Sequence, residues 1–160
     1  MTATATIRKL AAQRIAVLSV SPAEEDHFRL QDIFSSPQRT LYPDLAFAMT
    51  AKSTISAAKS ALKQGHVSIV LCEYDLSPGS WKELLDFADG LPAPPLVIVT
   101  SRVADERMWA EVLNLGGYDV LAKPLNNEEV IRTVTSAWSL WLHRFQLRAG
   151  SARKAGGSAA

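Results

Sequence analysis

The chain has 160 residues, of which 48% are hydrophobic, and its 17 Lys and Arg nearly balance its 16 Asp and Glu. This length suits one domain with its own core, and the charge balance excludes a broad field for nucleic acid or an anionic membrane. The lone cysteine, Cys72, excludes an internal disulfide, and no apolar stretch approaches the roughly 20 residues that a membrane helix needs. We therefore expect a cytoplasmic protein that does not enter a membrane.

Short apolar runs alternate with helical patterns through the body of the chain. The apolar runs cover residues 15–20, 45–49, 67–72, 96–100 and 120–121, and the helical patterns cover 24–34, 54–63, 81–88, 105–115 and 128–145. Continuous apolar runs indicate strands that are buried on both faces, as in a parallel sheet with helices on each side. The pattern predicts an α/β fold with a doubly wound, five-stranded parallel sheet.

The ends of the chain differ from this body in composition. Residues 1–13 precede any strand pattern and carry no motif, so we interpret them as a leader before a domain over residues 14–146. Residues 147–160 are rich in Ala, Gly and Ser, and no acidic residue follows Glu129. This composition predicts a disordered basic tail, for which contact with nucleic acid is unlikely, and no attached output domain.

Three helix starts have the spacing of a capping box, in which a polar side chain precedes a glutamate by three residues. The pairs are Ser21 with Glu24, Ser80 with Glu83 and Asn126 with Glu129. Pro22 is also suited to the first helical position. The spacing predicts that Ser21, Ser80 and Asn126 cap their helices.

Polar side chains follow the predicted strands at the edge where parallel sheets carry their chemistry. In chain order they are Ser21 and Pro22, then Glu73 and Asp75, then Thr100, and finally Lys123 and Pro124. Because the carboxyl ends of parallel strands meet at one edge, we expect a carboxylate, a hydroxyl and an ammonium to converge there.

The motifs around these residues resemble those of response-regulator receiver domains of the CheY-like superfamily. The segment 69–73, with Pro78 in the loop after it, is similar to the family's third strand, and Glu73 stands where an aspartate accepts the phosphoryl group. Thr100 stands at the switch hydroxyl, and residues 116–124 resemble the family's Gly-Ala-x-Asp-Tyr-x-x-Lys-Pro ending, with Lys123 and Pro124. The resemblance covers about residues 14–142 and implies the strand order 2-1-3-4-5.

The departures from the family bear most on function. Receivers bind Mg²⁺ through an acidic pair after the first strand and through the acceptor aspartate, but Ser21 and Pro22 occupy the positions of the pair. Without carboxylates there, Mg²⁺ loses preferred ligands and phosphoryl transfer loses its electrostatic clamp. Glu24 and Glu25 lie nearby, but we interpret them as helix cap and dipole partners. We expect no metal and no cofactor.

Two interpretations of Glu73 remain open. Its carboxylate, longer by one methylene than that of aspartate, could mimic a phosphorylated state while Lys123 pairs with it and Thr100 donates a hydrogen bond. Alternatively, Glu73 and Lys123 form an ordinary ion pair. Asp75 could also accept a phosphoryl group, although a loop aspartate is more often a turn residue.

Aromatic residues on the last two helices are candidates for an interface. The last helix carries a heptad-like stripe of Ile131, Val134, Trp138, Trp141 and Phe145. We expect its first part to cover the sheet and its distal aromatics to bind a partner helix or a second copy. Trp109 adds to a face of the fourth and fifth helices through which receivers commonly dimerise, so the interface candidates are Trp109, Trp138, Trp141 and Phe145.

The leading hypothesis is a stand-alone atypical receiver that acts by protein contact in phosphorelay-type signalling and is not an enzyme. Val120 supports the departure from ordinary switching, because it stands where the family has an aromatic switch residue. The alternatives are a true phosphoacceptor that uses Asp75 and a small-molecule sensor that uses the vacated pocket.

Overall fold

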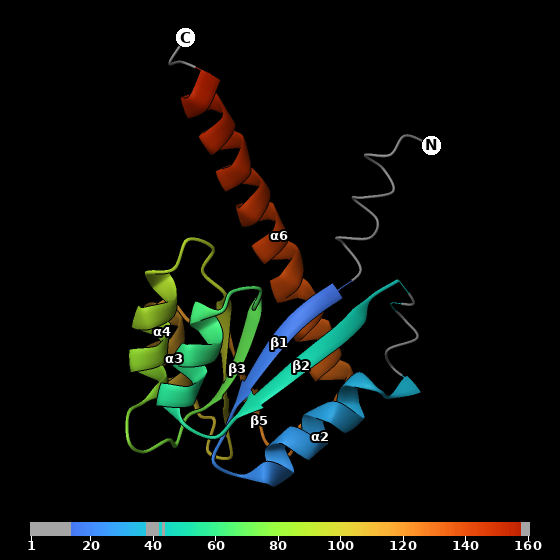
Figure 1. The fold of residues 1–160 in the computed structure, drawn as a ribbon. Coiled ribbons are helices and arrows are strands. Elements are labelled where there is room, and N and C mark those ends of the chain that lie inside the picture. The colour runs from blue at the N-terminus through green and yellow to red at the C-terminus, as the bar shows by residue number, and fades with distance from the viewer. Residues whose placement is uncertain (1–13, 38–41, 43, 158–160) are drawn as a thin grey trace.

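The computed structural model describes residues 14–37, 42 and 44–157 (Figure 1). Their strands form one five-stranded parallel sheet in the order β2-β1-β3-β4-β5, so the predicted fold class and strand order are confirmed. The strands are β1 (Arg14–Val20), β2 (Ala46–Lys52), β3 (Ile69–Glu73), β4 (Leu96–Ser101) and β5 (Asp119–Ala122). The helices are α2 (Glu24–Phe34), α3 (Ile55–Lys63), α4 (Trp81–Asp89), α5 (Glu106–Asn114) and α6 (Asn127–Gly157).

Each face of the sheet is covered by its own helices, which separates the core into two clusters. Along β1, Val17 belongs to the cluster with α2 and α6, whereas Leu18 belongs to the cluster with α3, α4 and α5. Along β3, Leu71 and Val70 divide in the same way. This alternation follows from the two-residue period of a strand, and it explains why the central strands are apolar at successive positions.

Strand β2 lies at the edge of the sheet and extends further than predicted. The apolar run predicted residues 45–49, whereas β2 spans Ala46–Lys52 and pairs with β1 from Arg14↔Ala46 to Val20↔Lys52. Pairing with β1 satisfies the backbone groups on one side of β2, so the strand continues into polar residues that propensity alone would not assign to it. Its apolar face is held by Phe47, whose ring stacks on Phe34 of α2 with the ring centroids 4.7 Å apart.

The capping predictions are correct at one helix and wrong at two. The Asn126 side chain accepts a hydrogen bond from the Glu129 amide at 3.0 Å, as its spacing predicted. Helix α2 instead has Ala23 at its N-cap position, and Ser80 of α4 makes no side-chain cap hydrogen bond. Ser21 does not cap α2, because its hydroxyl donates a hydrogen bond to the carboxylate of Asp26 instead.

Helix α6 continues to Gly157 and extends away from the sheet (Figure 1). Residues 147–157, which were predicted to be a disordered tail, are helical in the structure, whereas the domain end at residue 146 stays a prediction. The Ala, Arg and Lys residues of this segment favour a helix, against the cost of about 1 kcal/mol for a glycine in a helix interior at Gly150, Gly156 and Gly157. The predicted leader, residues 1–13, and residues 158–160 lie outside the described residues.

None of the helices in the described segments combines the length and the apolar composition needed to cross a membrane.

Candidate functional site

The structure brings together three of the polar residues that follow the strands. Glu73 ends β3, Thr100 lies in β4, and Lys123 follows β5. The Lys123 ammonium donates a hydrogen bond to Oε2 of Glu73, and the Thr100 hydroxyl donates to the same oxygen at 3.3 Å. Glu73 is only 8% exposed, so these contacts satisfy a carboxylate that has left most of its water.

A second carboxylate, which sequence reasoning missed, completes this cluster. The Lys123 ammonium also donates to Oδ2 of Asp26 at 2.7 Å. The Ser21 hydroxyl donates to that oxygen at 2.5 Å and accepts from the amide of Ala23 at 3.2 Å. One ammonium thus lies between two carboxylates, and Ser21 orients one of them.

The sequence analysis interpreted Glu24 and Glu25 as helix cap partners and did not consider Asp26. Asp26 is the third residue of α2, and the first turn of a helix that follows a parallel strand lies over the carboxyl end of that strand. Glu24 and Glu25, the two acidic residues considered from the sequence, are both exposed. Asp26 therefore places a carboxylate beside the end of β1, five residues beyond Ser21.

The pKa of Asp26 lies below its ordinary value. Burial raises it, but the hydrogen bonds from Lys123 and Ser21, together with the charges of Lys123 and Arg102, outweigh that effect. Asp26 is therefore ionised at neutral pH and supplies a fixed negative charge to the site.

The His27 side chain links the start of α2 to the end of β1 through two contacts. Its Nδ1 lies 2.8 Å from the Ser19 hydroxyl oxygen, and its Nε2 lies 3.1 Å from the Ser21 carbonyl oxygen. Both serines are buried. Because Asp26 directly precedes His27, these two contacts hold the Asp26 carboxylate in place against Lys123.

The residues of this site do not fit the Mg²⁺ that the receiver resemblance implies. Ser21 and Pro22 offer no carboxylate, and both carboxylates that are present, Asp26 and Glu73, are occupied by the Lys123 ammonium. Within the described ranges, no group of three His, Cys, Asp or Glu side chains is placed to hold a metal ion. The cationic position of the site is filled by the protein itself.

Asp75, the other predicted acceptor, lies outside this cluster. Its side chain is exposed, and its backbone amide donates to Oε1 of Glu73 at 3.4 Å. The amide contact helps to orient Glu73, while the Asp75 carboxylate faces solvent.

A cavity of about 490 Å³ lies beside the cluster. Asp26 and Lys123 line it together with Glu25, Arg29, Arg102, Pro124 and Leu125. Arg29 is not a free cation there, because it donates to the Leu125 carbonyl at 2.8 Å and to the Asn127 side chain at 2.6 Å. Arg102 is exposed at the cavity.

The switch position has no movable aromatic residue. Val120 is 1% exposed and packs in the cluster under α3, α4 and α5, whereas Tyr118 packs against the cluster on the opposite face. The two side chains therefore cannot substitute for one another in one switch.

Cys72 is also buried. Burial and the neighbouring Glu73 charge raise the pKa of its thiol to about 12, so the thiol is a poor nucleophile at neutral pH.

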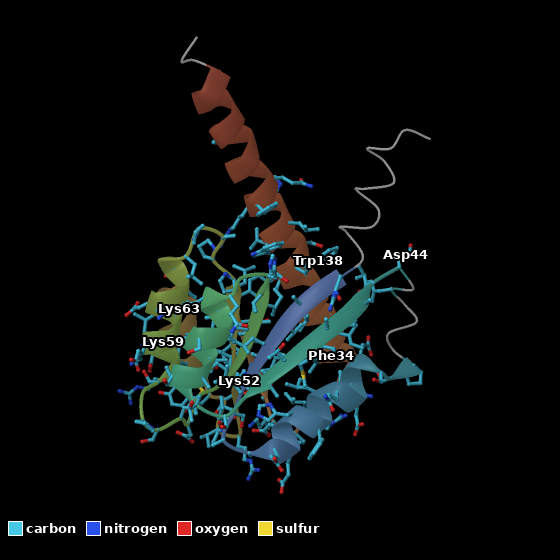
Figure 2. The ribbon with its side chains drawn as sticks, in the orientation of Figure 1. Phe34, Asp44, Lys52, Lys59, Lys63 and Trp138 are labelled. Atoms are coloured by element: carbon cyan, nitrogen blue, oxygen red, sulfur yellow. The ribbon has the colours of Figure 1, made fainter. Side chains whose placement is uncertain are left out.

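The predicted interface residues divide into buried and accessible ones. Trp138 is 7% exposed and belongs to the core beside β1 (Figure 2), so its prediction as an interface residue is corrected. Trp109 on α5 is 41% exposed, and Phe145 is 48% exposed with its ring stacked on the partly buried Trp141 at 5.3 Å.

No protein-family model matches this sequence, and no curated protein is significantly similar to it. Several solved structures share its fold. The signal receiver domain of an HD domain-containing protein from Pseudomonas fluorescens Pf-5 has a TM-score of 0.70 at 20% identity, over 84% of this chain and 93% of its own.

Two further structures agree with this match. The receiver domain of a putative LuxO repressor protein from Vibrio parahaemolyticus has a TM-score of 0.68 at 16% identity, over 84% of this chain and 97% of its own. A CheY-like receiver domain protein from Methanospirillum hungatei JF-1 has a TM-score of 0.65 at 14% identity, over 82% of this chain and 99% of its own. The chain therefore has the fold of the receiver domains of two-component response regulators.

Proposed function

We propose that this chain is an atypical receiver domain that works in two-component signalling by protein contact, without conventional Mg²⁺-dependent phosphorylation. The observation that carries this proposal is the Lys123 ammonium placed between Glu73 and Asp26. The Lys123 ammonium offsets one of the two carboxylate charges from within the protein. No external cation is then needed to assemble it.

Phosphoryl transfer makes demands that this site does not meet. Charge develops on the transferred group, and Mg²⁺ held by carboxylates is what neutralises it in such reactions. Here the carboxylates that could hold Mg²⁺ are engaged by Lys123, and the acceptor position carries glutamate. The same contacts support the interpretation that Glu73 holds the site in one permanent state, since Lys123 and Thr100 both donate to its Oε2.

Intact-mass spectrometry after incubation with acetyl phosphate and Mg²⁺ tests the proposal. We expect no phosphoryl-sized gain in mass, while a working receiver incubated alongside gains one. A gain that disappears in Asp75→Asn would overturn the proposal and identify Asp75 as the acceptor. The exposed position of Asp75 beside Glu73 is what makes this variant the informative one.

The state imposed by Glu73 is tested separately with Glu73→Gln. The glutamine keeps the length of the side chain but removes one of the two negative charges that hold Lys123. If Glu73 maintains an active-like arrangement, the variant changes partner binding or self-association, measured by analytical ultracentrifugation. Unchanged association would reduce Glu73 and Lys123 to an ordinary ion pair.

The cavity beside Lys123 favours a second candidate function, which is sensing of a small anion. It is large enough for a small metabolite and has Arg102 exposed at its wall. A concentration-dependent rise in Tm with one class of small anions, lost in Arg102→Ala, would support it. Equal shifts of Tm in the parent protein and in Arg102→Ala would show that the anions act as nonspecific salt.

We also propose a homodimer through α5 and α6, supported by the exposed indole of Trp109. We expect Trp109→Ala to shift the sedimentation of the protein toward that of the monomer. The control variant is Phe28→Ala, which removes an exposed aromatic ring from α2.

A further inference from the structure

Trp141 lies where α6 leaves the sheet, and it borders three hollows at the end of the domain opposite the Lys123 site. Their volumes are about 550, 240 and 40 Å³. Besides Trp141, they are lined by residues of β1 and β2, by the end of α3 and the segment before β3, by the loop between α4 and β4, and by neighbouring turns of α6. We call this surface the Trp141 face.

The charges that line the Trp141 face have one sign. Its ionisable residues are Arg14, Lys63, His66 and Arg144, and no Asp or Glu lines any of the three hollows. The sequence of α6 continues this bias, because no acidic residue follows Glu129 while four Arg or Lys follow Trp141. The net charge of the whole chain is only +1, so this is a local separation of charge.

Apolar side chains lie beside these cations without a cover in the described part of the chain. The stacked rings of Trp141 and Phe145 form one wall of the smallest hollow, with Ala93 and Pro94 opposite. Leu147, one turn of α6 from Arg144, is exposed. Figure 1 shows no other labelled element beside this part of α6.

We propose that the Trp141 face binds an acidic amphipathic helix of a partner protein. The proposal rests on the proposed function, which is action by protein contact, and it names the surface and the chemistry of the partner. Apolar side chains at helical spacing enter the hollows on the two sides of Trp141. The acidic residues that flank them pair with Arg144, Lys63 and Arg14.

Other occupants fit this surface less well. A second copy that used the same face would bring its own Arg144 and Lys63 against those of the first, and like charges in an interface cost free energy. Nucleic acid binds through rows of cations along its phosphates, which apolar hollows do not provide. A membrane would bury apolar residues along one continuous helix face, whereas here the hollows lie between α6 and other elements of the domain.

A synthetic peptide of about 18 residues, or five helical turns, serves as the probe. It carries leucine at helical spacing on one face, glutamate elsewhere and a fluorescent label, and its affinity for the full chain is measured by anisotropy. A peptide of the same composition with a scrambled order and a peptide with lysine in place of glutamate are the probe controls. We expect binding of the acidic amphipathic peptide alone, weakening as salt is added.

Two matched pairs of variants locate the binding. Arg144→Glu should weaken the affinity for the peptide by at least about tenfold. Arg132→Glu should not, because Arg132 is an exposed arginine of the same helix that lies outside the hollows. Phe145→Ala should also weaken it, whereas Trp109→Ala should not. Circular dichroism verifies that each variant is folded, and because Arg144 and Phe145 are exposed we expect both variants to fold.

Each outcome decides the proposal. Equal binding of scrambled and amphipathic peptides, or equal loss in Arg144→Glu and Arg132→Glu, would overturn it in favour of nonspecific charge attraction. Tighter binding to duplex DNA or to phosphatidylserine vesicles, lost in Arg144→Glu, would assign the face to that ligand. A failure here leaves the phosphoryl-labelling result unaffected, so this proposal and the proposed function can fail independently.

Discussion

Lys123 is the residue on which the site depends, because its ammonium joins three separate parts of the fold. It follows β5, and it contacts Glu73 at the end of β3 and Asp26 in the first turn of α2. The Lys123 and Glu73 side chains are each 10% exposed. Removing the ammonium would leave two carboxylates facing each other with little water, which is costly.

Lys123→Met is therefore expected to lower the free energy of unfolding by about 3 kcal/mol, as for other broken buried pairs. Adding Glu73→Gln to that variant should restore part of the loss, because it removes one of the unpaired charges. Urea unfolding followed by tryptophan fluorescence measures both. A loss for Lys123→Met no larger than that of an exposed ion pair, about 0.5 kcal/mol, would show that the cluster contributes little.

The lowered pKa of Asp26 predicts a pH dependence with a definite sign. A carboxylate whose pKa is lower in the folded state than the unfolded value of about 3.9 stabilises the protein above that value, and the stabilisation is lost as pH falls through the folded pKa. Asp26→Asn should thus be less stable than the parent at pH 7, and the difference should narrow below about pH 4. Urea unfolding across this range measures it, and a difference independent of pH would contradict the assignment.

The residue scale also shows where sequence reasoning succeeds and fails. Glu73, Thr100 and Lys123 could be predicted as neighbours, because each is tied to a strand end and parallel strands end together. Asp26 could not be separated from Glu24 and Glu25 by spacing alone. Which of three successive acidic residues faces the strand ends depends on where α2 begins, and the helix begins at Glu24 and not at Pro22.

At the scale of elements, strongly patterned segments were predictable and edges were not. The predicted third helix, residues 81–88, corresponds to α4 at Trp81–Asp89, since its apolar positions repeat with the helical period. Strand β2 takes its length from pairing with β1, and α6 takes its length from helix propensity beyond the core. Trp138 was misassigned because its position in the stripe did not reveal how far the sheet reaches along α6.

The two halves of α6 should respond differently to truncated side chains. Ile131 is fully buried against the sheet, so Ile131→Ala should lower the free energy of unfolding by about 3 kcal/mol through lost burial and a cavity. Phe145→Ala, on the same helix, should change it by less than about 0.5 kcal/mol, because that ring is 48% exposed. Guanidinium unfolding compares them. Similar losses would mean that the distal part of α6 is part of the cooperative core.

For the whole molecule, the sheet separates two apolar clusters that β1 and β3 share. Cys72 lies in the central strand β3 and is fully buried in one of them. Since it is the single cysteine of the chain, its reactivity reports on the opening of that central strand.

Thiol labelling at pH 8 should accordingly be very slow in the native protein. With a pKa of about 12, about one thiol in ten thousand is ionised at this pH, and burial adds a barrier to access. We expect Cys72 to be labelled at least about a thousandfold more slowly in the native protein than in concentrated urea. Mass spectrometry at successive times measures the two labelling rates. Rapid labelling without denaturant would show that β3 opens locally, without unfolding of the whole domain.

Helix α6 also sets a distance. Its 31 residues, at about 1.5 Å per residue, make a rod of about 46 Å. The start of this rod is fixed beside the Lys123 site by the contact between Arg29 and Asn127, and Trp138 holds it against the sheet. A helix keeps its length where a flexible linker does not, so whatever binds the far end is held at a fixed separation and bearing from the site.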